Sequence, residues 1–214
     1  MKFLKNILLF LFIDIFLSKN HYQGNYYFNH FLCNLFVTLF TVKDVVRSFT
    51  DFYECEKYEC NEIVISLIYG LHLYHSIYYF KKLDIDDITH HVSALCVCVP
   101  LALYFSPGSL LGYSFFFTTG LPGMMNYFLL WKQRNGLYDR QLQKQWNRFL
   151  NVWIRNPGCI SCATLILLKA LVSQNQSRWY VMASILVAFI TVWNGSYFME
   201  QVVSDYAKRY LTHV

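Results

Sequence analysis

The chain has 214 residues, of which 56% are hydrophobic, 19% aromatic and 14% charged, and its formal net charge is +5. Soluble globular proteins carry about 25% charged residues, so this composition argues against a soluble domain, a disordered or collagenous chain, and a small secreted disulfide scaffold. The apolar residues form continuous blocks near the length of about 20 residues with which an α-helix crosses a bilayer. Because the blocks lack the alternation of membrane β-strands, the sequence predicts an all-α, multi-pass membrane protein.

Seven apolar blocks follow one another along the chain. They cover residues 3–18, 26–42, 62–80, 88–106, 109–131, 157–173 and 178–202. We therefore expect about seven transmembrane helices. The predicted division is an N-terminal hydrophobic helix with a short loop (1–25), a transmembrane domain (26–205) and a cytosolic tail (206–214).

The first block has two interpretations. Lys2 and Lys5 precede an apolar stretch, as in a secretory signal peptide or a signal anchor. Asp14 interrupts that stretch, and residues 18–20 lack the small-residue pattern of a cleavage site. These features favour a retained helix.

The charges of the loops predict an orientation, because positively charged loops resist translocation. The acidic loop around residues 51–59 is expected on the lumenal or outer side, and the loop 81–87 on the cytosolic side. The connection between the fifth and sixth blocks is also expected to be cytosolic. Its basic residues are Lys132, Arg134, Arg140, Lys144, Arg148 and Arg155.

Part of this connection, residues 138–155, has an amphipathic pattern. Leu142, Trp146 and Phe149 recur at helical spacing, whereas Arg140 and Lys144 belong to another face. The pattern is typical of an interfacial helix whose basic side binds anionic lipid headgroups. Packing against the cytosolic end of the bundle is the alternative. No nucleic-acid partner is expected, because the basic residues are few.

Two cysteine pairs allow different chemistry. Cys55 and Cys60 lie in the predicted lumenal loop, where an oxidising compartment would permit a disulfide. Cys159 and Cys162 form a CxxC, but no second pair or nearby histidine completes a zinc site. We expect no metal site there.

Four histidines are the most informative polar residues. His72 and His75 belong to the third block, and His90 and His91 begin the fourth. Ionisable groups within a span are costly and face the bundle interior or a hydrated space. The helical rise of 1.5 Å per residue places these four at a similar depth, so one polar site could collect them.

The remaining histidines, His21, His30 and His213, are expected to lie apart from this site, and too few histidines remain for a di-iron desaturase centre. An acidic turn just outside it could orient an imidazole; its residues are Asp84, Asp86 and Asp87. The imidazoles could act as general bases in acyl transfer or as metal ligands.

The fifth block contains a second polar feature. Gly120, Pro122 and Gly123 weaken the helix there, because proline lacks the N–H that an α-helix needs. Side chains of this segment could line a site for a lipid headgroup or substrate; they are Thr118, Thr119 and Asn126. A kink that packs against a neighbouring helix is the alternative.

The order of these features is similar to that of a known family. An early helix carries His30, Tyr69-Gly70 follows, then come residues 87–93 (DITHHVS) and residues 193–198 (WNGSYF). This pattern resembles the TLC-domain family, which includes ceramide synthases, translocon-associated membrane proteins and lipid-regulatory proteins. The resemblance covers residues 26–205. It implies six helices in a barrel around a cavity for a long acyl chain, in the endoplasmic reticulum or a related membrane.

In ceramide synthases the paired histidines belong to the catalytic signature, which falls on His90 and His91. The HisAsp pair and the further Asp of that signature are absent, because residues 118–120 read Thr-Thr-Gly and position 126 is Asn. The resemblance therefore favours a protein that binds, senses or handles a membrane lipid, with His72 and His75 beside the ligand and no resident cofactor. An oligomer is compatible with this.

Three alternatives remain open. The first is an acyltransferase that uses His90 and His91, with acyl-CoA as a co-substrate. The second is a fatty-acid elongase-like enzyme, because residues 72–75 (HLYH) resemble part of the elongase HxxHH box, although Ser76 stands where its last histidine should be. The third is a structural membrane protein without a ligand.

Overall fold

A computed structural model describes residues 2–83, 85–105, 108–173 and 177–211, and in these ranges the protein is all-α without a β-strand. The α-helices are α1 (Lys2–Lys19), α2 (Asn25–Thr50), α3 (Glu62–Tyr78), α4 (Ile85–Val92), α5 (Val99–Phe105), α6 (Ser109–Phe115), α7 (Leu121–Arg134), α8 (Arg140–Leu150), α9 (Asn156–Val172) and α10 (Arg178–Leu211). Two 3-10 turns are η1 (Phe52–Lys57) and η2 (Phe80–Lys82), and three π-helical segments are η3 (Ser93–Cys98), η4 (Phe116–Gly120) and η5 (Asn151–Arg155).

Each π-helical segment joins two α-helices into one rod, and each ends two residues before a proline. The prolines are Pro100, Pro122 and Pro157. Proline has no N–H to donate to the carbonyl four residues earlier, and its ring clashes with that carbonyl. The wider π-turn removes this conflict without ending the helix. The rods are therefore α4–α5, α6–α7 and α8–α9, and the predicted weak point around Gly120 is confirmed as one of these junctions.

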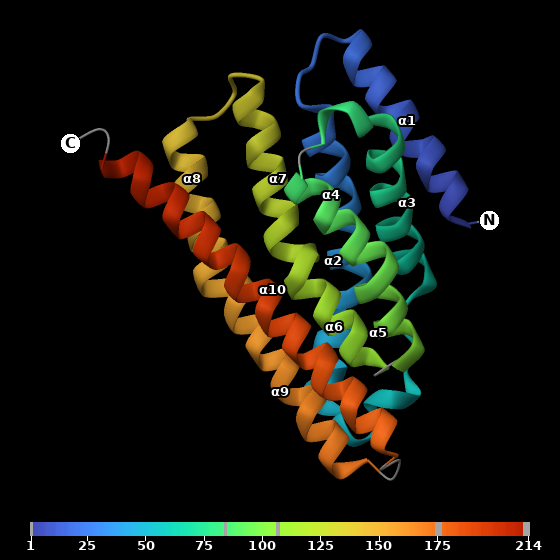
Figure 1. Ribbon diagram of the computed structural model, residues 1–214. Helices are drawn as coiled ribbons and strands as arrows, with labels where there is room; N and C mark the ends of the chain where they lie inside the picture. The colour runs from blue at the N-terminus through green and yellow to red at the C-terminus, as the bar shows by residue number, and fades with distance from the viewer. Residues whose placement is uncertain (1, 84, 106–107, 174–176, 212–214) are drawn as a thin grey trace.

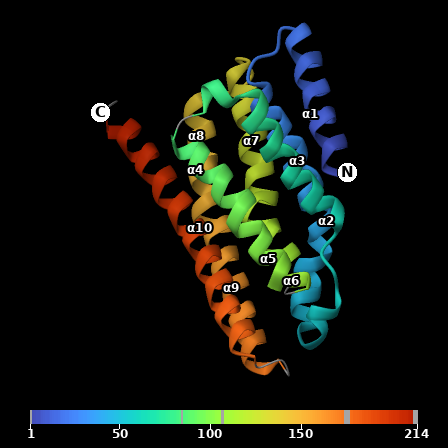
Figure 2. The same cartoon turned by 45° about the vertical axis from the view of Figure 1, so that its right-hand side comes forward.

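The rods run alternately up and down, and they lie side by side as a bundle (Figure 1). α1 ends and α2 begins at the end that also holds the α7–α8 connection and the C-terminal part of α10. The opposite end holds η1, the start of α3, the end of α9 and the start of α10. α9 and α10 remain adjacent in the rotated view (Figure 2).

Two of the described helices are long and apolar enough to cross a membrane. They are the α8–α9 rod, Arg140–Val172 with 33 residues, and Arg178–Lys208 with 31 residues. Residues 140–155 continue directly into the sixth apolar block within the α8–α9 rod, so they are not a separate helix.

The basic face of α8 is directed at α10. Lys144 Nζ lies 2.6 Å from a carboxylate oxygen of Asp205, and the Arg148 guanidinium lies 4.4 Å from the centre of the Tyr206 ring. Trp153 and Phe149, on another face, are exposed. The expected packing of this segment on the bundle is therefore found, while its binding to anionic headgroups stays a prediction.

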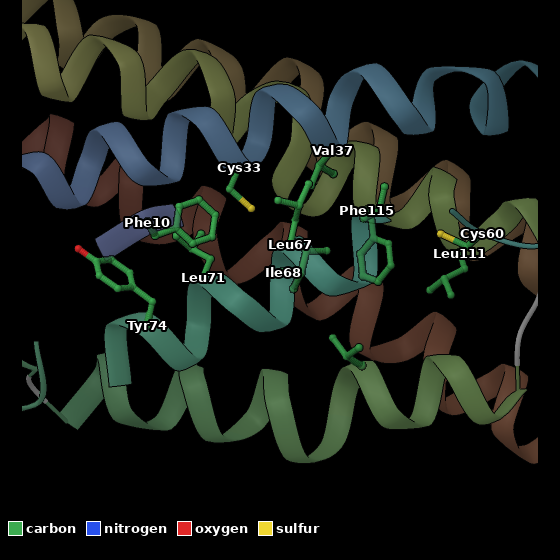
Figure 3. Packing of buried hydrophobic residues seen from close by; sticks show 12 residues of the cluster. Phe10, Cys33, Val37, Cys60, Leu67, Ile68, Leu71, Tyr74, Leu111 and Phe115 are labelled. Carbon is green, nitrogen blue, oxygen red and sulfur yellow. The ribbon is translucent and has the colours of Figure 1, made fainter. Parts of the chain in front are cut away.

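The core has two apolar clusters. One lies between α1, α2, α3 and α6, and Figure 3 shows its side chains directed into the space between these helices. Phe10 and Tyr74 stand next to each other in it, with ring centres 6.0 Å apart. The other cluster joins η1, α6, α9 and α10. α1 contributes to the first cluster, so it packs as part of the bundle.

Glycines at two contacts let the rods approach closely, as small residues do where transmembrane helices pack against one another. A Cβ atom at Gly112 would lie 2.0 Å from Asp44 Oδ2, and one at Gly158 would lie 2.1 Å from the Phe117 ring. These contacts join α6 to α2 and α9 to η4. They fix the α6–α7 rod, which carries part of the polar site, at the centre of the bundle.

Candidate functional site

The four predicted histidines come together between α3 and α4. The ring centre of His72 lies 5.4 Å from that of His90 and 5.3 Å from that of His91, and His75 lies 5.8 Å from His91. His75 and His91 are buried, and His90 lies at the more open edge of the group. With a rise of 1.5 Å per residue, the group lies about 5 to 9 Å inside the ends of both helices.

The backbone determines which nitrogen of His72 carries a proton. His72 Nδ1 lies 2.8 Å from the Ile68 carbonyl oxygen, which can only accept, so Nδ1 donates. In neutral His72 the lone pair is then on Nε2, which lies 3.4 Å from His90 Nε2. His90 is therefore the donor in this contact, and its Nδ1 atom keeps a free lone pair. The arrangement supplies a proton acceptor at the open edge of the cluster.

His30 belongs to the same cluster, so the expectation that it lies apart is wrong. Its ring stacks on His75 at 4.3 Å and on Tyr127 at 4.3 Å, and His75 stacks on Tyr26 at 4.2 Å. His30 is contributed by α2 and Tyr127 by α7. The column of rings thus links four rods through five histidines and two tyrosines. Only the position of His30 inside an apolar block gave a signal for it.

His75 is the most enclosed member of this histidine cluster. Its side chain is fully buried, and neither ring nitrogen has a hydrogen-bond partner in the described part of the chain. A neutral imidazole carries one N–H donor and one lone pair. Buried polar groups in proteins are nearly always paired. The cluster therefore holds unused hydrogen-bonding capacity where a ligand could meet it.

A buried carboxylate supports the cluster from α1. Asp14 Oδ2 accepts hydrogen bonds from the hydroxyls of Tyr74 and Tyr79, and its Oδ1 accepts from the Asn25 amide at 3.1 Å. Tyr74 precedes His75 in α3, and the Tyr79 ring packs edge-on against Tyr26. Asp14 thus fixes the positions of Tyr74 and Tyr79, the tyrosines next to His75. In the sequence it was visible only as an acid inside an apolar block.

The polar residues of the fifth block are used within the bundle. Thr119 Oγ1 donates to Asn34 Oδ1 at 2.8 Å, and Asn126 Oδ1 accepts from Gln143 Nε2 at 2.9 Å. Thr118 Oγ1 donates to the Ser114 carbonyl oxygen at 2.8 Å. These bonds join the α6–α7 rod to α2 and α8. The ring contact to the histidines comes instead from Tyr127, next to Asn126.

Arg155 is the last residue of η5, so it lies within the α8–α9 rod and not in a loop between two helices. Its guanidinium lies 5.0 Å from the centre of the Phe198 ring, and that ring also contacts His90 at 6.3 Å. Nη1 donates to Asn151 Oδ1 at 2.8 Å. Arg155 is therefore a second functional candidate, placed next to the histidine cluster.

Across the ranges that the structure describes, no group of three or more histidine, cysteine or acidic side chains is placed to hold one metal ion. The acidic turn expected to orient an imidazole, Asp84 with the side chains of Asp86 and Asp87, lies outside the described residues.

The two loop cysteines do not form the disulfide considered above. Cys55 and Cys60 are both free and buried, and they belong to different apolar clusters. Burial raises the pKa of the Cys60 thiol to about 12, with the negative charge of Asp44 adding to the effect, and burial also raises the pKa of Cys55. Both thiols are therefore protonated at neutral pH and act as apolar packing groups.

No protein-family model, curated protein or solved structure matches the chain. The resemblance to TLC-domain proteins therefore stays a prediction, and the functional argument rests on the geometry of the site.

Proposed function

We propose that this protein is a multi-span membrane protein that binds a lipid or acyl chain inside its helical bundle and thereby influences membrane lipid composition. The polar end of the ligand would meet the histidine cluster of His30, His72, His75, His90 and His91. The observation that carries the proposal is the fully buried imidazole of His75, whose two nitrogens have no partner in the described structure.

The outer surface supports the membrane part of this proposal. Large apolar side chains point outward on α1, α2, α9 and α10, for example Phe12 at 67%, Leu39 at 59%, Leu171 at 73% and Phe189 at 66% exposure. A soluble protein rarely exposes so much contiguous apolar surface. Seven rods with this surface fit seven bilayer crossings. The resemblance to TLC-domain proteins favours the endoplasmic reticulum or a related membrane.

Charge at the two ends supports the proposed orientation. Lys132, Arg134 and Arg140 lie at the end where α7 is followed by α8, whereas Glu54 and Glu56 lie in η1 at the other end. The basic end would face the cytosol. The histidine cluster then lies just inside the cytosolic boundary, where a lipid headgroup could reach it.

The proposal is tested by asking whether lipid stays bound to the purified protein. We expect the wild-type protein, extracted in mild detergent, to retain lipid that native mass spectrometry detects, and the His90→Ala, His91→Ala double variant to retain several-fold less. His21→Asn is the matched control, because His21 is exposed and has a φ of 61° that asparagine tolerates. A wild-type protein free of lipid, or equal retention in all three proteins, would contradict the proposal.

Acyl transfer to a lipid amine or hydroxyl is the second candidate, and the proton arrangement of His90 favours it. With its Nε2–H directed at His72, His90 could accept the proton of the attacking group at Nδ1. The attacking nitrogen or oxygen would form the new bond to the acyl carbon of acyl-CoA, the carbon–sulfur bond would break, and the proton would pass to the departing thiolate. Acyl-CoA turnover that is equal in wild type and in the double variant would exclude this role.

A further inference from the structure

Arg155 carries a full charge inside the α8–α9 rod, on a half-buried side chain next to the histidine cluster. It lies about 22 Å along the helix axis from Arg140, where the α8–α9 rod begins. Neighbouring residues of this rod, such as Cys159 and Cys162, are fully buried. A charged side chain at such a depth is costly and marks a functional site unless it is paired.

Two other cations of the same rod, Lys144 and Lys169, are paired with carboxylates. Lys144 lies 2.6 Å from a carboxylate oxygen of Asp205, and Lys169 lies 3.6 Å from one of Glu56 while donating to the Tyr53 carbonyl oxygen. Among the side chains that the structure describes, no carboxylate pairs with Arg155. Its bond to Asn151 is to a neutral amide, and its Nε atom is buried without an acceptor. Within the part of the chain that the structure describes, Arg155 therefore has spare donors and no paired carboxylate.

The local backbone places this charge at the histidine cluster. Pro157 forces the π-turn that ends at Arg155, and π-turns of this kind occur frequently at functional sites. The Phe198 ring contacts both the guanidinium of Arg155, at 5.0 Å, and the imidazole of His90, at 6.3 Å. The spare donors of Arg155 and the unpartnered nitrogens of His75 thus belong to adjoining parts of one polar region.

We propose that Arg155 binds the anionic group of the lipid, a phosphate monoester or a carboxylate, beside His90. The anion site rests on the proposed lipid-binding function, and it specifies that the bound lipid is anionic. A guanidinium pairs two oxygens of such a group through parallel hydrogen bonds. The anion would supply the counter-charge that the described side chains do not provide, while its acyl chains would occupy the apolar interior.

The test compares lipids that share acyl chains and differ in charge. Protein in detergent is titrated with phosphatidic acid, with a free fatty acid and with the neutral diacylglycerol, and binding is followed by native mass spectrometry and thermal stabilisation. We expect the wild-type protein to bind one of the two anionic lipids about tenfold or more tightly than diacylglycerol. Preference for phosphatidic acid identifies a phosphate ligand, and preference for the fatty acid identifies a carboxylate.

Three variants separate this site from the basic surface. Arg155→Gln should lose the preference for the anionic lipid, and Arg155→Lys, which keeps the positive charge, should lose about threefold or more of it, because an ammonium cannot pair two oxygens. Arg148→Gln removes a charge two turns earlier on the same rod, where the side chain is exposed, and should leave the preference unchanged.

The outcomes distinguish the two proposals. Equal binding of anionic and neutral lipids by wild type would overturn the anion site and leave lipid binding intact, whereas binding of none of the lipids would overturn both. An unchanged preference in Arg155→Lys and Arg155→Gln, or a loss in Arg148→Gln as large as in Arg155→Gln, would also overturn the role of Arg155. Stabilisation by inorganic phosphate as strong as by phosphatidic acid would show that the anion is not part of a lipid.

Discussion

Two buried aspartates, Asp14 in α1 and Asp44 in α2, occupy opposite kinds of environment. Asp14 is 2% exposed, and both its carboxylate oxygens accept hydrogen bonds, from Tyr74, Tyr79 and Asn25 among others. Asp44 is fully buried, and among the described residues neither of its carboxylate oxygens has a hydrogen-bond partner.

The contrast shows two roles for a buried aspartate: Asp14 holds neighbouring side chains by hydrogen bonds, whereas the carboxylate of Asp44 is surrounded by the described helices without bonding to them. Removing the Asp14 side chain would take away the acceptor that the hydroxyls of Tyr74 and Tyr79 share next to the histidine cluster, and buried donors that lose their acceptor are costly. Removing the charge of Asp44 would leave no donor behind. In the sequence both residues are the same interruption of an apolar block, so their difference arises entirely from the helices packed against them.

The largest effect is expected for Asp14→Ala. Loss of the shared acceptor should lower the free energy of unfolding by about 3 kcal/mol or more, measured by denaturant unfolding in detergent micelles. Because α1 is held to α3 at this point, limited proteolysis should cut α1 faster in the variant. Asp51→Ala removes an exposed acid and serves as the control. Unfolding at the same denaturant concentration in both variants would show that the Asp14 bonds do not stabilise the bundle.

Helix boundaries were largely predictable from the length of apolar runs. The third block was expected at residues 62–80 and is Glu62–Tyr78, and the sixth was expected at 157–173 and is Asn156–Val172. The second block was expected to end at residue 42, but α2 continues to Thr50. The added turns include Asp44 and Arg47, which hydropathy alone assigns to a loop although both pack against the bundle.

The histidine site could be predicted only in part. Spacing and depth brought His72, His75, His90 and His91 together, because a helix has a known rise and neighbouring blocks are joined by a short turn. To predict that His30 joins this site, one must know how α2 and α3 are rotated relative to each other, and no local sequence pattern contains that information.

Two patterns applied to Arg155. The amphipathic pattern of residues 138–155 predicted that it is helical, and its charge predicted a place in the connection between the fifth and sixth blocks. Asp139 caps the helix that starts at Arg140, with its side chain accepting from the Leu142 backbone N–H. The continuation of this helix through η5 into α9 is not contained in the charge pattern.

A smaller loss is expected where Asp44 meets α6. Gly112→Ala would place a Cβ atom 2.0 Å from Asp44 Oδ2, so α2 and α6 must separate or Asp44 must move. Overpacking of this kind lowers the free energy of unfolding by about 1 to 3 kcal/mol. A double-mutant cycle identifies the source of this loss. When Asp44 is also replaced by alanine, Gly112→Ala should hardly change the free energy of unfolding. Additive losses in the cycle would assign the cost to the helix backbones instead.

The smallest effect, and the opposite sign, is expected for Asp44→Asn. The amide has nearly the shape of the carboxylate and carries no charge into the bundle interior, so the free energy of unfolding should stay unchanged or rise by up to about 1 kcal/mol. Asp14→Asn is the matched substitution and should destabilise, because an amide NH₂ would face donors that now meet an oxygen. Denaturant unfolding of the two variants side by side measures the difference. If Asp44→Asn destabilises the protein as much as Asp14→Asn does, the negative charge of Asp44 contributes to stability. Asp44 would then interact with a partner group and would not merely be enclosed by α6.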